Sequence, residues 1–410
     1  MGDLVSYIKR GVQPQYDEEG FIPALRTVNI RQDGFSMTRQ EYINQDFYDA
    51  NPRGQIQHGD ILITSTGVGT LGRVAYNYER QLFFADGHIT ILRRIEKLKP
   101  LFVTAFLQSH IGLDLIERRQ RGSSGQIEIY PSDISSISIP IMPIQFQNEI
   151  EQHYLKANQL REQSKTLYAE AEALLLHELG LDALDLSVEA GYEGSFAEMM
   201  AADRMDAEYF HPEKTHILET LDKMPGQLLR NYFRSVRSVI NPPINDTGEM
   251  VYNYDLTDAL PYFLTNDIEP IATYELGSTK KRFKHGDVVV SRLRSYLKEI
   301  SIVTTSGDIP CVGSSEFIVL RQTAQKVSPE LLLVYLRNPY IQKILKWCQN
   351  GSNHPRFDEK DLLNIKFPDS LVAIEQDILN LITQVFQLQQ EAKRLLEEAK
   401  AQVEAMILGA

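Results

Sequence analysis

The chain has 410 residues, of which 43% are hydrophobic and 24% are charged, and its formal net charge is −13. These values are typical of a soluble globular protein, and the length predicts more than one domain. No run approaches eighteen apolar residues, the N-terminus lacks a signal pattern, and Cys311 and Cys348 have neither zinc-site nor disulfide-framework spacing. We therefore expect a cytoplasmic protein without a membrane span, a metal or a cofactor.

The negative charge is concentrated in two segments. Residues 145–202 carry 3 basic and 11 acidic residues, and residues 375–410 carry 3 and 6. The remaining segments are nearly balanced, so the overall charge does not exclude DNA binding.

Each half of the chain predicts a β-rich mixed domain. Short apolar or β-branched runs between Gly, Asp and Ser predict strands over 56–66, 72–78, 87–93, 286–292, 300–305 and 315–321. Amphipathic patterns predict helices over 101–119 and 329–348. Ser328 and Pro329 suit the N-cap and first residue of the second of these helices.

Each half closes with a segment of coiled-coil character, over 145–178 and 375–410. Steps of three and four join Ile150, His153, Ala157, Leu160, Ser164, Leu167, Ala171 and Leu174 in the first segment, and Ile378, Ile382, Val385, Gln389, Ala392, Leu396, Ala399, Val403 and Met406 in the second. The simplest arrangement packs the two helices on each other in antiparallel fashion, although such helices could instead serve oligomerisation. Small residues such as Ala157 and Ala392 would permit a close approach.

The two halves repeat each other. His58-Gly59-Asp60-Ile61-Leu62-Ile63 returns as His285-Gly286-Asp287-Val288-Val289-Val290, and Ile91-Leu92-Arg93 returns as Val319-Leu320-Arg321. Gln120-Arg121-Gly122-Ser123 and Gln147-Asn148-Glu149-Ile150 return, at nearly the same offset, as Gln349-Asn350-Gly351-Ser352 and Gln376-Asp377-Ile378-Leu379. A half-chain repeat predicts a duplicated binding domain, over 1–144 and 203–374, with a linker over 179–202. With the two helices, this predicts an α+β dumbbell with pseudo-twofold symmetry.

Two motifs suggest a catalytic site or a cofactor, and neither fits its context. Gly67-Val68-Gly69-Thr70-Leu71-Gly72 matches a dinucleotide fingerprint, but a β-type run follows it where a helix is required. Asn241-Pro242-Pro243-Ile244 is similar to a methyltransferase motif, with Ile in place of the aromatic residue that stacks on a flipped base. We interpret both as loops, and no residue set for catalysis is found.

Basic and amide side chains gather at three predicted loops, where they could contact phosphates and base edges. The candidate DNA-binding residues are Arg118, Arg119, Arg121, Ser123, Ser124 and Gln126 in the first half, and Lys280, Lys281, Arg282, Lys284, Arg292, Arg294, Asn350, Asn353 and Arg356 in the second. Charged loops are commonly only solvated, so a solvated surface is the alternative interpretation of this composition.

The whole arrangement resembles the specificity subunit of type I restriction–modification systems. The resemblance lies in "GDILITSTGVGTLGRVAY" (59–76) with its counterpart "GDVVVSRLRS" (286–295), in the similar closing segments of the two halves, and in "RMDAEYFHPE" (204–213), a lead-in that the first half lacks.

The resemblance implies a non-enzymatic subunit whose two domains each read one half of a split, asymmetric double-stranded DNA site. It also implies that the two helices form a spacer that docks two methyltransferase subunits, and that restriction and translocase subunits complete the assembly. Two alternatives stay open, namely the specificity subunit of a type IIB-like enzyme and a duplicated protein-binding scaffold.

Overall fold

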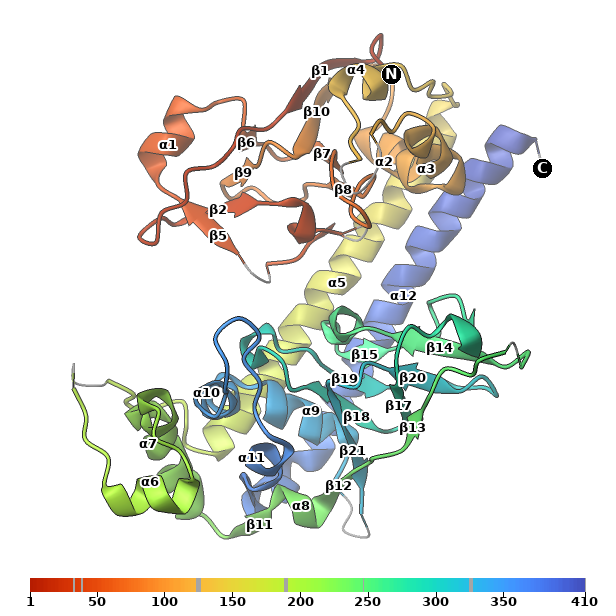
Figure 1. The fold of residues 1–410 in the computed structure, drawn as a ribbon. Coiled ribbons are helices and arrows are strands. Elements are labelled where there is room, and N and C mark those ends of the chain that lie inside the picture. The colour runs from red at the N-terminus through yellow and green to blue at the C-terminus, as the bar shows by residue number, and fades with distance from the viewer. Residues whose placement is uncertain are drawn as a thin grey trace. The chain divides into compact units, whose positions relative to one another are not determined.

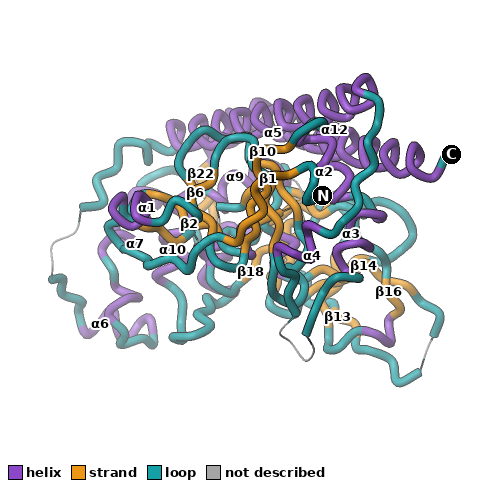
Figure 2. The backbone as a smooth tube through the Cα atoms, turned by 90° about the horizontal axis from the view of Figure 1, so that it is seen from above, coloured by secondary structure: helices purple, strands orange, loops and turns teal. Residues whose placement is uncertain are grey.

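The structure is a computed structural model that describes residues 1–31, 34–37, 40–122, 127–187, 191–245, 247–323 and 327–409. The chain forms two compact units, unit 1 with Met1–Glu162 and Leu388–Ala410, and unit 2 with Gln163–Gln387 (Figure 1). Both units combine helices with strands, as the colours in Figure 2 show. The predicted α+β class is therefore confirmed.

Unit 1 contains two four-stranded sheets. The first is antiparallel, with the order β1 (Val5–Arg10), β10 (Ile89–Ile95), β7 (Ile61–Thr64) and β8 (Val74–Tyr76). The second has the order β5 (Glu41–Ile43), β2 (Ile22–Leu25), β9 (Phe83–Ala85) and β6 (Gln55–Ile56). In it, β2 runs parallel to β9. A small pair, β3 (Ile30–Arg31) and β4 (Gly34–Phe35), and helix α1 (Gln45–Ala50) complete this part.

Unit 2 contains two five-stranded sheets. The first has the order β12 (Phe233–Ser235), β21 (Phe317–Gln322), β18 (Val288–Ser291), β19 (Ile300–Val303) and β15 (Phe263–Leu264). The second has the order β13 (Val239–Ile240), β17 (Lys280–Phe283), β20 (Cys311–Gly313), β14 (Met250–Tyr254) and β16 (Ile271–Ala272). A further pair joins β11 (Gly226–Leu228) to β22 (Lys366–Pro368).

The duplication extends to both sheets of each unit. The order β1-β10-β7-β8 recurs as β12-β21-β18-β19, and β5-β2-β9-β6 recurs as β16-β14-β20-β17. Even the one parallel pair of the second sheet recurs, because β14 runs parallel to β20 as β2 does to β9. The repeated motifs lie in the first sheet and the helices, so the second sheet repeats its topology without repeating its sequence motifs.

The two segments predicted as single amphipathic helices, 101–119 and 329–348, are each two consecutive helices. The predictions of one continuous helix are therefore wrong. In unit 1, α2 (Pro100–Gln108) is followed by α3 (His110–Glu117), and in unit 2, α9 (Pro329–Arg337) is followed by α10 (Pro339–Trp347). The breaks fall at Ser109 and Asn338, whose extended backbone ends one helix while the side chain caps the next. The predicted N-cap at Ser328 is confirmed.

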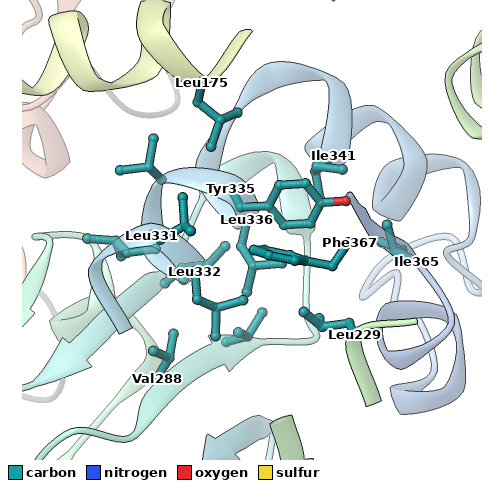
Figure 3. Close-up of a cluster of buried hydrophobic side chains, with 14 of the residues drawn as sticks. Leu175, Leu229, Val288, Leu331, Leu332, Tyr335, Leu336, Ile341, Ile365 and Phe367 are labelled. Atoms are coloured by element: carbon teal, nitrogen blue, oxygen red, sulfur yellow. The ribbon is translucent and has the colours of Figure 1, made fainter. Parts of the chain in front are cut away.

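The core of unit 2 lies between α9, α10 and the first sheet. Leu331, Leu332 and Leu336 of α9 lie near Val288 of the sheet, and Tyr335 contacts Phe367 with ring centroids 5.0 Å apart (Figure 3). All these side chains are buried, and their removal from water supplies the main stabilisation of the unit. The predicted strands are confirmed, except that 56–66 is two strands, β6 and β7, separated by a turn.

The long helices are α5 (Ile144–Glu178) and α12 (Glu375–Leu408), and each contributes to both units. In unit 1, Ile150 and Tyr154 share a buried cluster with Ala399 and Val403, while Ala157 and Leu160 share one with Ala392. The chain directions there are therefore opposite. In unit 2, the buried cluster joins three residues of each helix, namely Tyr168, Ala171, Leu175, Ile378, Ile382 and Val385.

The buried positions of α5 differ from the predicted heptad at three of its eight positions. Tyr154, Tyr168 and Leu175 are buried, where the prediction has His153, Leu167 and Leu174. The other five predicted positions, Ile150, Ala157, Leu160, Ser164 and Ala171, are buried as predicted. The buried position therefore moves by one residue at three places only. Leu167 and Leu174 still pack beside the cluster as half-buried residues, as does Leu396 of α12 in unit 1.

The remaining helices connect these parts. Unit 1 has α4 (Pro131–Ser135), and unit 2 has α11 (Glu359–Leu363) at the corresponding place. Unit 2 also has α6 (Phe196–Ala202), α7 (Pro212–Asp222) and α8 (Leu229–Tyr232) before its first sheet.

Candidate nucleic-acid interface

The repeated His-Gly-Asp motif forms a turn that holds a buried ion pair. In unit 1, Arg93 of β10 donates to Asp60 through Nε (2.7 Å) and Nη2 (2.6 Å). In unit 2, Arg321 of β21 donates to Asp287 through the same two atoms, both at 2.7 Å. The glycines between His and Asp have φ angles of +89° and +82°, which a residue without Cβ adopts freely. The repeated motif therefore fastens adjacent strands and is structural.

Two loops meet in unit 1 beside this sheet. The hairpin loop of unit 1 (residues 65–73) joins β7 to β8, and its helix-exit loop (118–130, described except for 123–126) follows α3. Ile129 N donates to Ser65 O (2.9 Å), and Gly67 N donates to Ile127 O (3.2 Å). Thr66 and Glu128 form an isolated β-bridge between the loops. The glycine motif is a loop between strands, as predicted, because β8 follows it.

The same two loops meet in unit 2 through equivalent bonds. Its hairpin loop (292–299) joins β18 to β19, and its helix-exit loop (348–358) follows α10. Phe357 N donates to Arg292 O (3.2 Å), and Arg294 N donates to Pro355 O (2.9 Å). Leu293 and Arg356 form the corresponding bridge. The two units thus present the same composite surface, built from loops that are distant in sequence.

In unit 1 this surface carries cations over an aromatic ring. Arg121 donates to Asp133, and its guanidinium lies 5.5 Å from the centroid of the Tyr130 ring. Arg10 lies 4.9 Å from the same centroid and donates to Glu128 Oε2 (2.9 Å). Hydrogen bonds from Tyr130 and Arg10 lower the pKa of Glu128. The Arg121 side chain is still 62% exposed, so it can reach a ligand.

In unit 2 the cations share a carboxylate. Arg356 Nη2 donates to Glu316 Oε1 (2.8 Å), and Arg292 Nε lies 3.6 Å from Glu316 Oε2. The hydrogen bond from Arg356 lowers the pKa of Glu316. Burial lowers the pKa of Lys281, whose charge interacts with those of Arg292 and Glu316. The site therefore holds several positive groups around Glu316, and Arg292 Nη2 also lies 3.8 Å from Asp358 Oδ1.

The remaining candidates do not all join these clusters. Arg118 pairs with Asp114 of its own helix (3.0 Å), and Arg119 donates to Ser136 Oγ (2.8 Å). Ser123, Ser124 and Gln126 lie outside the described residues.

The second-half candidates divide in a similar way. Lys280 and Arg282 alternate with Lys281 along β17, so their side chains leave the strand on the opposite face. Lys284 follows the strand and is exposed. Asn350 pairs with Arg356 through the backbone, and Asn353 O accepts from Arg294 Nη2 (3.0 Å).

The lead-in motif of residues 204–213 supports the helix-exit loop of unit 2. Arg204 donates to Cys348 O (3.1 Å) and Gln349 O (3.2 Å), where α10 ends and the loop begins. Asp206 accepts from Arg204 Nε (2.6 Å), and the Tyr209 ring lies against the same guanidinium, 4.5 Å away. The lead-in motif therefore positions the start of the helix-exit loop.

Sequence reasoning missed Arg10, Tyr130 and Glu316. The repeat could have revealed Arg10, because Arg10 in β1 and Arg237 after β12 occupy equivalent places in the two halves. In unit 2, Arg237 pairs with Glu359 (3.3 Å). Glu316 and Tyr130 enter the site only through tertiary contacts.

The described part of the chain contains neither a metal-binding cluster nor a recognisable methyltransferase site. No group of three His, Cys, Asp or Glu residues there could hold a metal ion. The Asn241–Ile244 motif lies in a loop, where Ile244 is fully exposed and Asn241 Oδ1 accepts from Thr279 Oγ1 (2.7 Å). No helix among the described residues is long and apolar enough to cross a membrane.

Several solved structures are similar to the chain at low identity. One belongs to a study of complex assembly and conformational transition of the type I R-M system (15% identity, 98% of this chain and 94% of that chain, TM-score 0.30). Another is the S subunit of a type I restriction-modification system from M. genitalium (14% identity, 98% of this chain and 93% of that chain, TM-score 0.41). A further one is the HsdS subunit from Thermoanaerobacter tengcongensis (15% identity, 98% of this chain and 94% of that chain, TM-score 0.31). TM-scores below 0.5 do not establish a shared arrangement of the whole chain. No curated protein sequence matches the chain.

A family model gives the direct assignment. Residues 1–157 match the type I restriction modification DNA specificity domain. This range covers both loops of unit 1, their sheet and the start of α5. The match agrees with the family that the repeated motifs resemble. Residues 1–157 are therefore similar to the type I restriction modification DNA specificity domain.

Proposed function

We propose that the chain is the non-catalytic DNA sequence-recognition subunit of a type I restriction–modification complex. In this proposal, each unit reads one half of a bipartite, asymmetric site in double-stranded DNA. The helices α5 and α12 hold the units apart as a pseudo-twofold dumbbell and dock two methyltransferase subunits, and restriction and translocase subunits join that assembly.

One observation carries the proposal. The hairpin and helix-exit loops meet in both units through equivalent backbone bonds, and one of the two units matches a DNA specificity domain. Both composite surfaces present arginines beside exposed loop backbone, and arginine is the side chain that most often contacts guanine edges and phosphates. A duplicated reading surface is suited to a site of two parts.

The distribution of charge supports the same division of labour. The acidic surplus lies in and around α5 and in α12, whereas the segments that carry the loops are nearly balanced. Acidic helices repel phosphates and suit a protein partner, while the balanced units can bring their arginines to DNA.

The test is to co-express the chain with its neighbouring methyltransferase and to map methylated adenines across the genome. We expect one bipartite motif with two unlike halves. Arg121→Ala should weaken methylation through one half only, and Arg356→Ala through the other half only, since loss of a base-edge contact costs about 1–3 kcal/mol.

Arg118→Ala is the matched control, because Arg118 is also exposed and ion-paired but bonds to its own helix. Arg118→Ala should leave the methylated motif unchanged, and it should not alter the salt dependence of DNA affinity. A methylation map without a bipartite motif would contradict the proposed function.

A further inference from the structure

The two hairpin loops share their anchors and differ at their tips. In each loop, residues with a positive φ flank the tip, namely Gly67 (+101°) and Gly72 (+83°) in unit 1 and Arg294 (+50°) and Lys298 (+52°) in unit 2. Gly69 (+75°) adds a third positive φ in unit 1. Between these ends, unit 1 exposes Val68, whose exposed fraction is 69%, and unit 2 exposes Tyr296, at 55%. The tip is thus a place where one fold displays two different side chains.

The unit 2 loop maintains a conformation that its residues disfavour. Left-handed backbone is strained for Arg and Lys and free of strain for the glycines of unit 1. Such strain persists only where the surroundings determine it, and it is frequent at binding sites.

The surroundings of this loop are well defined. Arg337 Nη1 donates to Lys298 O (2.9 Å) and Ile300 O (2.7 Å), which fixes the end of the loop. Arg294 N donates to Pro355 O (2.9 Å) and Arg294 Nη2 to Asn353 O (3.0 Å), which fixes its start on the helix-exit loop.

The side chains beside the tip point inward. Ser295 and Leu297 are 4% and 5% exposed, so Tyr296 is the one residue of the turn Ser295–Leu297 that faces solvent. A rigid backbone that displays one large aromatic ring loses little conformational entropy when the ring binds. Solvation alone gives no reason for a strained turn to hold this ring outward.

We propose that the tip of each hairpin loop contacts base edges in the groove of double-stranded DNA, through Tyr296 in unit 2 and Val68 in unit 1. The proposal rests on the proposed function and adds the residues that make the two half-sites unlike. Val68 offers an apolar contact suited to a thymine methyl group, while Tyr296 adds a hydroxyl that can hydrogen-bond a base edge. The ion pairs of the His-Gly-Asp turns are the same in both units, so they cannot distinguish the half-sites.

The experiment assembles the full chain with its methyltransferase and measures both the methylated motif and the affinity for the wild-type site. Tyr296→Val should change the preference at one or two positions of a single half-site and weaken binding roughly tenfold to hundredfold. Val68→Tyr should change the other half-site and leave the first intact. Tyr274→Val is the matched control, since Tyr274 has a similar exposure (48%) but lies in the turn after β16.

The outcomes separate the two proposals. If the wild-type complex produces no bipartite motif, the proposed function fails before the tip is tested. If it does, and Tyr296→Val leaves both motif and affinity unchanged, the tip proposal is overturned. If Tyr296→Val reduces assembly with the methyltransferase but leaves the motif unchanged, the tip proposal is also overturned. Tyr296 would then contact the protein partner and not DNA. The melting temperature of each variant shows whether it folds. If Tyr296→Val does not fold, Tyr296→Phe, which removes only the hydroxyl, is tested by the same two measurements.

Discussion

At the scale of single residues, the repeated Asp and Arg form the same buried ion pair in each half of the chain. The Asp60 and Asp287 side chains are each 1% exposed, and each also accepts a backbone N–H, from Gln57 (2.7 Å) and Lys284 (2.9 Å). The carboxylate therefore fixes the turn and the neighbouring strand together, which explains why the two motifs occur as a pair.

Removing one partner of this ion pair should be costly. Asp287→Ala leaves Arg321 partly buried without its counter-charge, and we expect a loss of about 3–5 kcal/mol in the unfolding free energy of unit 2. Urea denaturation followed by hydrogen exchange of unit 2 peptides would measure it. Asp114→Ala, which breaks an exposed pair, should change little. Equal effects of the two variants would contradict the structural role.

The Glu316 carboxylate should make unit 2 sensitive to acid. The hydrogen bond from Arg356 lowers its folded-state pKa below the ordinary value of 4.5, so it stabilises the fold above that pH. This stabilisation is lost as the pH falls from about 4.5 through the lowered pKa. Urea midpoints of the wild type and Glu316→Gln should therefore differ at about pH 6 and converge in acid. A constant difference would show that the charge of Glu316 is not responsible.

At the scale of elements, the break between the paired helices depends on a cap that both units use. Asn338 Oδ1 accepts from Tyr340 N (2.9 Å) and Ile341 N (3.0 Å), while Nδ2 donates to Tyr335 O (2.6 Å). Ser109 Oγ accepts from Gly112 N (3.2 Å) and donates to Phe106 O (2.7 Å). Each side chain thus satisfies the end of one helix and the start of the next.

Asn338→Ala should lower the unfolding free energy by about 1–3 kcal/mol, because it leaves buried backbone groups unsatisfied. Asn338→Ser should recover much of this loss, since serine performs the same role at position 109. Thermal denaturation of the full chain gives the comparison. The cap model fails if alanine and serine at position 338 are equally destabilising.

At the scale of the whole molecule, the spacing between half-sites should follow the length of α5 and α12. Four residues inserted after Ala169, with four more after Gln384 in the facing part of α12, add about 6 Å at 1.5 Å per residue. One base pair rises about 3.4 Å, so the motif should lengthen by one or two base pairs while both half-sites keep their bases.

Two-residue insertions at the same places are the control. They rotate the buried positions by about 200°, which turns Tyr168 and Val385 out of register with their cluster and should impair assembly. Genome-wide methylation maps report both outcomes. Altered bases with an unaltered spacing would show that the helices do not set the distance.

The sequence by itself determined the elements whose signals are local. Heptad steps predict the helices near α5 and α12, β-branched runs predict β7, β10, β18 and β21, and the repeat of Asp60 and Arg93 as Asp287 and Arg321 reveals the duplication. These features depend on residues a few positions apart, or on a direct comparison of the halves. The basic loops could therefore be found, but not their partners.

Only the tertiary structure decided which of those residues form the site. The strand alternation of β17 separates Lys281 from Lys280 and Arg282, and Glu316 reaches Arg356 across 40 positions of the chain. The equivalence of the second sheets rests on strand pairing, which many different sequences satisfy through backbone hydrogen bonds. The exposure of Tyr296 likewise depends on Arg337 and Asn353, which hold its loop from other elements, because a side chain's direction is set by the backbone packed beneath it.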